Sequence, residues 1–176
     1  MEQKNIKAII GLGNPGPKFH LNRHNIGFLV LDELIRRAGG TWQHKDLADV
    51  AEITLHDKKL ICVKPLTFMN ASGKVIPMLR KQGIAPTQIL VVHDELEKPF
   101  GNISIKCGGS AKGHNGLRSI IEACGDQFYR LRFGIGRPER REDVPDWVLT
   151  NFSEPREKLD ALISQAVDMI EKEIAA

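Results

Sequence analysis

Two short apolar runs constrain the fold more than any other feature of the sequence. The run Gln88-Ile-Leu-Val-Val-His93 has no polar residue between its ends, and Lys7-Ala-Ile-Ile-Gly11 repeats the pattern near the N-terminus. Uninterrupted runs of this length are typical of strands that are buried on both faces of a sheet. Because such strands need helices above and below them, the two runs predict the centre of an α/β sheet.

Two long amphipathic segments supply helices to cover that sheet. Residues 25–38 place their apolar side chains on one face and their charged side chains on the other, and Gly39-Gly40 is expected to end the helix. The last helix is predicted to begin near Ser153, which can cap it, with Pro155 tolerated in the first turn.

The remaining elements complete a mixed sheet. Further strands are predicted at 51–56, 59–64, 101–106 and 129–135, and further helices at 72–82 and 116–123. The first two of these strands are close enough to form a hairpin with a turn at Asp57-Lys58. The sequence contains no linker or repeat. We therefore predict one globular α/β domain over residues 1–176, with a central mixed, mostly parallel, twisted sheet covered by helices.

Composition and charge narrow the class of function. Hydrophobic residues make up 41% of the chain and charged residues 27%, which is ordinary for a globular protein. The net charge of +3 is uneven, since residues 98–141 contain nine basic and three acidic residues and so carry +6, against −3 for the remainder. A local basic surface indicates a polyanionic partner such as nucleic acid. Charges scattered over a solvated surface would give the same sequence pattern.

The sequence gives no indication of export or membrane insertion. Residues 1–5 lead directly into the first apolar run without the features of a signal peptide. No apolar stretch approaches the roughly 20 residues that a membrane span needs. The three cysteines lack metal-ligand spacing and are expected to be reduced thiols. We therefore expect a monomeric cytoplasmic protein with no membrane partner.

Four short polar clusters and one strand end carry the chemistry of the sequence. All fall at predicted strand ends or loops, and their key residues are Asn14, His24, Asn70, Asp94, His114 and Asn115. Asn and His side chains that face a shared pocket are costly unless they bind something. Amide donors, imidazole bases and a carboxylate are together suited to hydrolysis of a polar ester.

Three local patterns resemble other sites, and each lacks a required part. Gly11-Leu-Gly-Asn-Pro-Gly16 has the form of a dinucleotide-binding fingerprint, but no helical pattern follows it directly. Ser110 lies in a near match to a nucleophile elbow, with Lys112 where a glycine is required. His20 and His24 have the i,i+4 spacing of metalloprotease ligands without the accompanying glutamate, so we expect His20 to face solvent.

Six motifs taken together give a resemblance to a known family. In chain order they are GLGNPG from Gly11, RHNIG from Arg23, KPLTFMN from Lys64, VHDEL from Val92, KGHNG from Lys112 and YRLRFGIG from Tyr129. With this order and spacing, the sequence resembles the bacterial-type peptidyl-tRNA hydrolases from its first strand to its final helix. One such motif would be weak, whereas the set in register is specific.

The resemblance implies hydrolysis of the ester that joins a peptide to tRNA, with peptidyl-tRNA as the partner and with neither cofactor nor metal ion. His24 would act on water as general base, and Asp94 would orient its imidazole and stabilise the imidazolium. Lys106 and Arg132 would hold a terminal phosphate of the tRNA. The other substrate-binding positions would be Asn14, Phe19, Met69, Asn70, His114 and Asn115, with Met69 lining the pocket and His114 at its entrance.

The sequence departs from the family pattern in three places. Phe19 stands where Tyr is frequent, Lys112 stands where Gly is usual, and Glu97-Lys98 alters the pair that follows the Asp94 strand. Any contact that needs the Tyr hydroxyl is therefore in doubt. None of the three departures removes a candidate catalytic group.

Several assignments have alternatives in the sequence. The chain could be an RNA-binding relative without turnover, or a metal-assisted esterase that uses His24, His114 and Asp94. Lys106 and Arg132 are also compatible with ordinary surface charges. Asn70 and Asn115 could cap helices. His93 should point to the strand face opposite Asp94, and we expect it to be structural.

Overall fold

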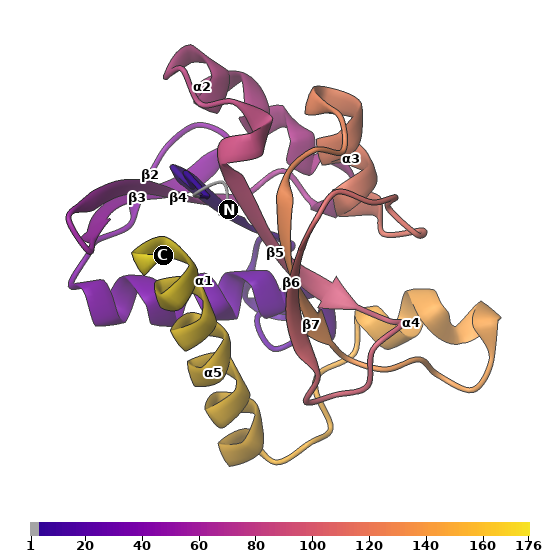
Figure 1. Cartoon of the computed structure of the whole chain (residues 1–176). Helices are drawn as coiled ribbons and strands as arrows, with labels where there is room; N and C mark the ends of the chain where they lie inside the picture. The colour runs from indigo at the N-terminus through magenta and orange to yellow at the C-terminus, as the bar shows by residue number, and fades with distance from the viewer. Residues whose placement is uncertain (1–3) are drawn as a thin grey trace.

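Residues 4–176, which this computed structural model describes, form a seven-stranded sheet with helices on both faces (Figure 1). The two apolar runs become the neighbouring central strands, as predicted. The strands are β1 (Ala8–Gly11), β2 (Gln43–His44), β3 (Ala48–Leu55), β4 (Lys58–Pro65), β5 (Ile89–Glu95), β6 (Ile103–Cys107) and β7 (Tyr129–Gly134). The α-helices are α1 (Ile26–Ala38), α2 (Ile76–Lys81), α3 (Asn115–Cys124), α4 (Val144–Val148) and α5 (Arg156–Ala175).

The sheet is mixed, with a parallel centre. Its strand order is β2-β3-β4-β1-β5-β7-β6. The four inner strands β4, β1, β5 and β7 are parallel to one another, and the pairings β2–β3, β3–β4 and β6–β7 are antiparallel. The predicted hairpin is β3–β4, but its turn lies one residue earlier than expected, because Lys58 already pairs with Leu55. The turn residues His56 and Asp57 both have positive φ, as a tight type I′ turn requires.

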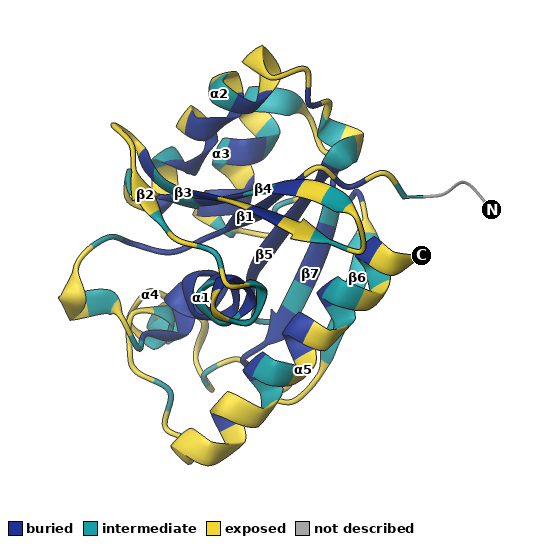
Figure 2. Cartoon of the chain, turned by 90° about the vertical axis from the view of Figure 1, so that its left-hand side faces the viewer, coloured by how far each residue is buried: buried dark blue, intermediate teal, exposed yellow. Residues whose placement is uncertain are grey.

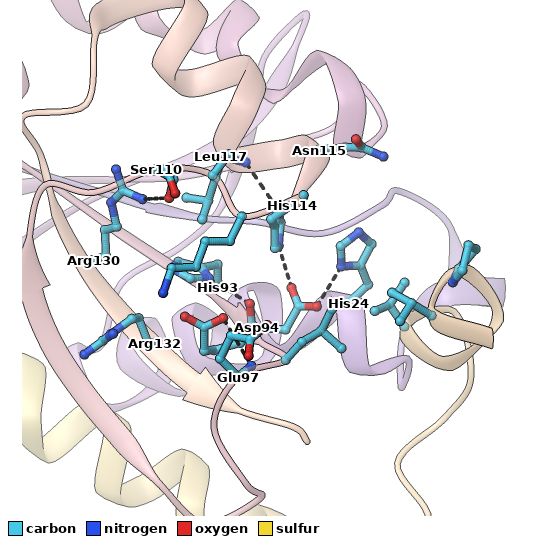
Figure 3. A pocket seen from close by; sticks show the side chains of 18 of the residues that line it. His24, His93, Asp94, Glu97, Ser110, His114, Asn115, Leu117, Arg130 and Arg132 are labelled. Atoms are coloured by element: carbon cyan, nitrogen blue, oxygen red, sulfur yellow. Dashed lines mark hydrogen bonds and ion pairs between the residues drawn. The ribbon is translucent and has the colours of Figure 1, made fainter. Parts of the chain in front are cut away.

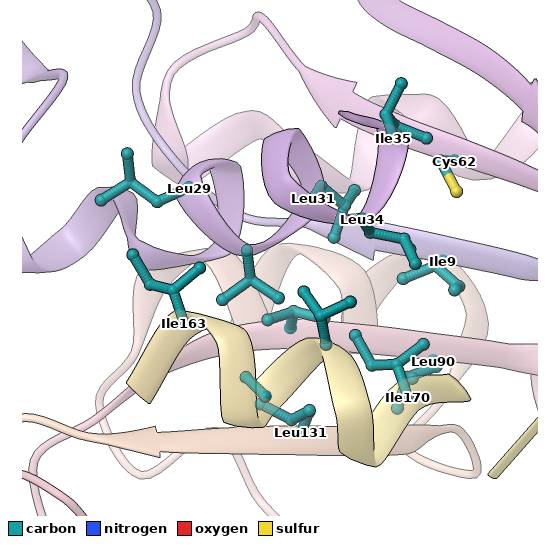
Figure 4. Packing of buried hydrophobic residues seen from close by; sticks show 14 of the residues in the cluster. Ile9, Leu29, Leu31, Leu34, Ile35, Cys62, Leu90, Leu131, Ile163 and Ile170 are labelled. Atoms are coloured by element: carbon teal, nitrogen blue, oxygen red, sulfur yellow. The ribbon is translucent and has the colours of Figure 1, made fainter. Parts of the chain in front are cut away.

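Alternation along the central strand divides the core into two clusters. Leu90 and Val92 of β5 face the cluster under α1 and α5, whereas Ile89 and Val91 face the cluster under α2 and α3. Figure 2 shows β5 and β7 buried between these layers, and Figure 4 shows α1 and α5 packing over Leu90. The same alternation sends the side chains of His93 and Asp94 to opposite faces at the end of β5.

The first helix begins in direct contact with the central strands. Gly27 lies so close to them that a Cβ atom there would come within 2.4 Å of the Leu12 nitrogen and 2.5 Å of the Val92 oxygen. No larger residue fits without a backbone shift, so the glycine fixes the start of α1 against the ends of β1 and β5. The helix ends as predicted at Gly39, which has a left-handed φ of 70°.

The predicted helix over 72–82 is divided. Residues Met69–Val75 form a 3-10 segment, η3, and α2 begins only at Ile76. Pro77 has no N–H that could donate to the carbonyl of Gly73, so the α-helical hydrogen bonds do not extend toward the N-terminus. In addition, the Gly73 nitrogen donates to Ser119 Oγ (2.8 Å) on α3 instead of to its own helix.

The last helix begins three residues later than predicted. Pro155 occupies the N-cap position of α5 and no side chain caps the helix, so the Ser153 cap is wrong. Ser153 Oγ instead accepts a hydrogen bond from Arg23 (3.3 Å), a contact between segments far apart in sequence. The apolar face of α5 is buried along the whole helix, at Leu159, Ile163, Ala166, Val167, Ile170 and Ile174. Within residues 4–176, no helix is both long and apolar enough to cross a membrane.

Candidate active site

A cavity opens at the carboxyl ends of the central parallel strands. After β1 the chain turns toward β4, and after β5 it turns the other way toward β7, so the strand order reverses between β1 and β5. Ligands of open α/β sheets bind at such reversals. The polar side chains that line the cavity come from β5, β6, β7, the turn before α1 and the start of α3: His24, His93, Asp94, Glu95, Glu97, Lys106, Ser110, Lys112, His114, Asn115, Arg130 and Arg132.

Two histidines share one buried carboxylate at the floor of this cavity (Figure 3). His114 was expected at the entrance of the pocket, and it lies at the floor instead because it contacts Asp94. His24 Nδ1 lies 2.9 Å from Asp94 Oδ2, and His114 Nε2 lies 2.7 Å from Asp94 Oδ1. His24 belongs to the 3-10 turn η2 (Arg23–Asn25) ahead of α1, and His114 immediately precedes α3. The two layers that cover opposite faces of the sheet therefore meet at Asp94.

The environment of this group shifts two pKa values in opposite directions. Burial disfavours the imidazolium of His24, but the charge of Asp94 and its hydrogen bond together outweigh burial and raise the pKa of His24 above 6.5. For Asp94, burial alone would raise the pKa. The interactions with His24 and His114 outweigh the effect of burial and hold the pKa of Asp94 well below its usual range. Asp94 is therefore ionised, and His24 takes up a proton more readily than a free imidazole.

The hydrogen bonds of His114 fix where its proton lies. His114 Nδ1 accepts from the backbone nitrogens of Gly116 (3.1 Å) and Leu117 (3.3 Å), so its hydrogen must be on Nε2, which donates to Asp94. His24, Asp94 and His114 offer three ligand atoms that lie within 4.8 Å of one another, so they are a candidate metal site. A metal at His114 Nε2 would force the hydrogen onto Nδ1, against two amide donors. The residues present therefore do not fit a metal ion.

His93 contacts the same group from behind. Its ring packs edge-on against His114, with centroids 5.4 Å apart, and its Nδ1 lies 2.8 Å from the Asp94 carbonyl oxygen. Burial, followed by the nearby His114, lowers the pKa of His93 to about 3, so this imidazole is neutral. The sequence analysis expected a structural role for His93. The cavity nevertheless includes it, because His114 extends across the end of β5.

Asn14 is held in place by two neighbours. Its Oδ1 accepts a hydrogen bond from the Met69 nitrogen (2.7 Å), while Asn25 bonds both the nitrogen and the oxygen of the Asn14 backbone (3.0 and 2.9 Å). The amide NH₂ of Asn14 is thus left as a donor. Met69 lies against the first turn of α3, since a Cβ at Gly116 would come within 2.5 Å of its sulfur. The sequence analysis did not identify Asn25 as the residue that orients Asn14, because that role depends on a contact between two separate loops.

Two exposed carboxamides and an aromatic pair lie outside this buried group. Asn70 and Asn115 are exposed, and Asn115 lines the cavity at the start of α3. Phe19 contacts Phe68 edge-on, with ring centroids 6.4 Å apart. Phe68 is 55% exposed and adopts a φ of 61°, which is costly for a bulky residue and occurs mostly at functional sites. Phe68 lies in the KPLTFMN motif, but no role was predicted for it, because its backbone strain has no local sequence signal.

The far end of the cavity is basic. Lys106 from β6 and Arg132 from β7 line it together with Lys112. Burial, followed by the charges of Arg132, Lys112 and Arg130, lowers the pKa of Lys106, which shows how closely these cations are gathered. Arg130 turns inward, where it is buried and donates to the Ser110 carbonyl (2.8 Å), so it orders the loop before α3.

The basic segment identified in the sequence is only partly neutralised by acidic neighbours. Arg137 is paired with Glu97, and Arg140 lies 3.0 Å from Asp143, both at the surface. These two cations are thereby balanced. The cavity, which also contains the acidic Glu95 and Glu97, is lined by four other basic residues of the segment: Lys106, Lys112, Arg130 and Arg132.

The short helix α4 forms an apolar wall of the cavity that the sequence analysis did not predict. Val144, Pro145 and Val148 line this wall. The buried Arg23 attaches it to the His24 turn: its guanidinium lies 3.6 Å from the centre of the Trp147 ring and donates to the Trp147 carbonyl (3.1 Å). The position of His24 is therefore coupled to that of α4.

Comparison with known proteins identifies the family. A family model described as peptidyl-tRNA hydrolase matches residues 8–176. The chain is 47% identical over 167 residues to a peptidyl-tRNA hydrolase of Frankia alni, covering 93% of this chain and 85% of that protein. It is 43% identical over 166 residues to one from Aquifex aeolicus, covering 92% and 84%. The crystal structure of peptidyl-tRNA hydrolase from Acinetobacter baumannii superimposes with a TM-score of 0.88 at 36% identity, covering 99% of this chain and 89% of that one. The chain belongs to the peptidyl-tRNA hydrolase family, which confirms the resemblance seen in its motifs.

The opposing pKa shifts give a test of the His24–Asp94 pair. Asp94→Asn removes the charge and the hydrogen bond that raise the pKa of His24 and leaves the burial that lowers it. We expect an NMR titration to place the His24 pKa above 6.5 in the wild type and below 6.5 in Asp94→Asn. Asp49→Asn, which removes the partner of the exposed His44, should leave His24 unchanged. An unchanged or higher His24 pKa in Asp94→Asn would contradict the pairing.

Proposed function

We propose that this chain hydrolyses the ester bond between a peptide, or another N-blocked aminoacyl group, and the ribose of tRNA. The observation that carries the proposal is the His24–Asp94 pair at the floor of a cavity whose far end is basic. The imidazole supplies a base for water, and the basic end suits a polyanion. Membership of the peptidyl-tRNA hydrolase family supports the same substrate. The cytoplasmic location and monomeric state expected from the sequence remain predictions.

The reaction follows from the state of each group. His24 Nδ1 is occupied by Asp94, which leaves Nε2 to take a proton from water as the water oxygen attacks the ester carbonyl carbon. Asp94 stabilises the imidazolium that forms. The C–O bond to the ribose then breaks, and the proton passes from His24 to the departing ribose oxygen. Water is the nucleophile in this scheme, because no serine or cysteine of residues 4–176 is hydrogen-bonded to His24.

The carboxamides provide donors for the substrate end of the reaction. The NH₂ group of Asn14, held by the Met69 contact, is oriented before the substrate arrives. Asn115 at the start of α3 lines the cavity, and the exposed Asn70 of η3 adds a further carboxamide to this set. Together they can donate to the carbonyl oxygen that becomes negative and can pair with the peptide amide on both its donor and acceptor sides.

Different side chains would bind the 3′-terminal base and a phosphate of the tRNA. The exposed Phe68 ring, supported by Phe19, offers a surface on which a base at the 3′ end can stack. Lys106 and Arg132 offer charge for a phosphate. The hydroxyl of a tyrosine at position 19 is not needed for stacking, so this departure from the family pattern is compatible with the proposal.

Removing the general base should abolish chemistry without abolishing binding. We expect His24→Ala to lower kcat for peptide release from N-acetyl-aminoacyl-tRNA by at least about a hundredfold, the lower range for a positioned base, with tRNA affinity retained. His20→Ala, at an exposed histidine in the same segment, should have normal turnover. If the wild type binds tRNA but releases no peptide, the chain is an RNA-binding relative. Near-normal turnover in His24→Ala would exclude His24 as the base.

The carboxamide set should discriminate between blocked and free α-amines. A free ammonium offers no acceptor carbonyl to the donors of Asn70 and Asn115 and is itself desolvated. The absence of a hydrogen-bonding group that a site is built for can cost on the order of ten-thousand-fold in kcat/KM. With one amino acid and one tRNA, we therefore expect fast release when the α-amine is acetylated and slow release when it is free, and Asn115→Ala should narrow the gap. Equal rates on the two substrates would refute amide recognition.

The basic end should act on tRNA affinity and on its salt dependence. We expect the Lys106→Ala/Arg132→Ala variant to raise KM for tRNA substrates and to flatten the log–log salt slope by about 0.7 to 0.9 for each phosphate that is no longer neutralised. The Lys59→Ala/Lys172→Ala variant removes two exposed cations elsewhere and is the matched control. Equal damage to turnover of a minimal ester without phosphate would assign Lys106 and Arg132 to catalysis or to the core.

A further inference from the structure

The two histidines on Asp94 are bound to it in nearly the same way. Each places one ring nitrogen within 2.9 Å of a different oxygen of the same carboxylate, and their ring centroids are 4.8 Å apart. Side-chain exposure also does not separate them, at 11% for His24 and 10% for His114. The distances to Asp94 alone therefore do not determine which imidazole takes up a proton.

The second ring nitrogen of each histidine breaks this symmetry. His24 Nε2 has no hydrogen-bond partner among residues 4–176. His114 Nδ1 accepts from two backbone amides at the start of α3, so the imidazole serves as the N-cap of that helix. N-caps are usually Ser, Thr, Asp or Asn, which present an oxygen to these amides. Here a ring nitrogen replaces that oxygen, and its lone pair is consumed.

We propose that the N-terminus of α3 selects His24 as the proton carrier of the group, by holding His114 as the neutral tautomer with its hydrogen on Nε2. His114 is then a positioning residue that acts through Asp94, rather than a second base. The inference rests on the proposed function, because it explains why one histidine of the two performs the general-base step.

The backbone amides at the start of α3 leave no place for a hydrogen on His114 Nδ1. A hydrogen on Nδ1 would face the N–H groups of Gly116 and Leu117, leaving three donors and no acceptor. His24 does not meet this obstacle, since its Nε2 has no hydrogen-bond partner among residues 4–176 and the residue lines the cavity.

The charged groups around the two histidines agree with this assignment. Asp94 and His93 of β5 contact His114, and the charge of Arg130 on β7 lowers the pKa of His93. His93 is neutral, and the charge of Arg130 helps to keep it so. Asp94 is the carboxylate that contacts both imidazoles, and an imidazolium that forms on His24 neutralises its single negative charge.

His114 also anchors the carboxylate. Its Nε2–H holds Asp94 Oδ1, which leaves Oδ2 directed at His24 Nδ1. Without this donor the carboxylate gains freedom to rotate, and its negative charge is shared with one hydrogen bond fewer. Loss of the donor should therefore misplace His24 and raise its pKa further above the ordinary value.

The tautomers can be measured directly on the wild-type protein. We expect ¹⁵N chemical shifts of the assigned histidines to show His114 with its hydrogen on Nε2 throughout the titration of His24, and His24 with its hydrogen on Nδ1 when neutral. A hydrogen on His114 Nδ1, or an imidazolium at His114 before one forms at His24, would overturn the proposal. This measurement needs no turnover. It therefore decides the role of His114 even if the wild type releases no peptide, an outcome that would refute only the proposed function.

Substitution by asparagine separates the capping role from the positioning role. In His114→Asn the side-chain oxygen can still cap α3, but the shorter side chain does not extend an N–H to Asp94. We expect a kcat reduced by up to about a hundredfold, as misplacement of a catalytic group can cause, a higher His24 pKa by NMR, and a Tm lowered by loss of the hydrogen bond to Asp94. His114→Ala, which also removes the cap, should lower Tm further.

His44→Asn is the control for this experiment. It makes the same substitution at an exposed histidine, and it should alter neither kcat nor the His24 pKa. If His114→Asn leaves the His24 pKa and kcat unchanged, or lowers that pKa, His114 is only a helix cap and the proposal fails.

Discussion

The arrangement of this molecule depends on one buried carboxylate at the end of its central strand. Asp94 is 3% exposed, at a depth where an isolated charge would cost several kcal/mol. Imidazoles from the two helical layers satisfy both of its oxygens, His24 from one side of the sheet and His114 from the other. The site is thus complete only when both layers are packed on β5. The requirements of folding and of chemistry coincide at this residue.

Two buried arginines order the surroundings without cancelling the positive charge. Arg23 donates to the Trp147 carbonyl, and Arg130 donates to the Ser110 carbonyl, each across a long separation in sequence. Burial lowers the pKa of both guanidinium groups. Both keep their charge, because the ordinary pKa of arginine lies far above neutral pH. Because the acceptors are backbone carbonyls and the Ser153 hydroxyl rather than carboxylates, the loops are held in place without neutralising either guanidinium.

The sequence was sufficient to predict the elements and site residues that depend on local patterns or on motifs. The two apolar runs placed β1 and β5, and the family motifs brought His24, Asp94, His114 and Asn115 to one cavity. It failed where distant contacts decide. Ser153 bonds Arg23 instead of capping α5, and Ser119 of α3 takes the Gly73 N–H and helps divide the predicted helix.

The residues absent from the predicted site share the same cause. Asn25 acts by bonding the backbone of Asn14, and α4 becomes a wall only because Arg23 holds Trp147. Phe68 is distinguished by a backbone angle, not by its residue type. Periodicity and spacing carry no record of such contacts, which exist only after the sheet has brought the loops together.

The contact between Arg23 and Trp147 has a consequence for how such a cavity can change over time. Arg23 and His24 are consecutive residues of one short turn, so the wall at α4 and the imidazole share a single mechanical support. A mutation that reshapes the wall to admit a different molecule will also pull on the histidine. Substrate range and reaction rate are therefore not independent traits in this architecture, and adaptation of one must be accompanied by repair of the other.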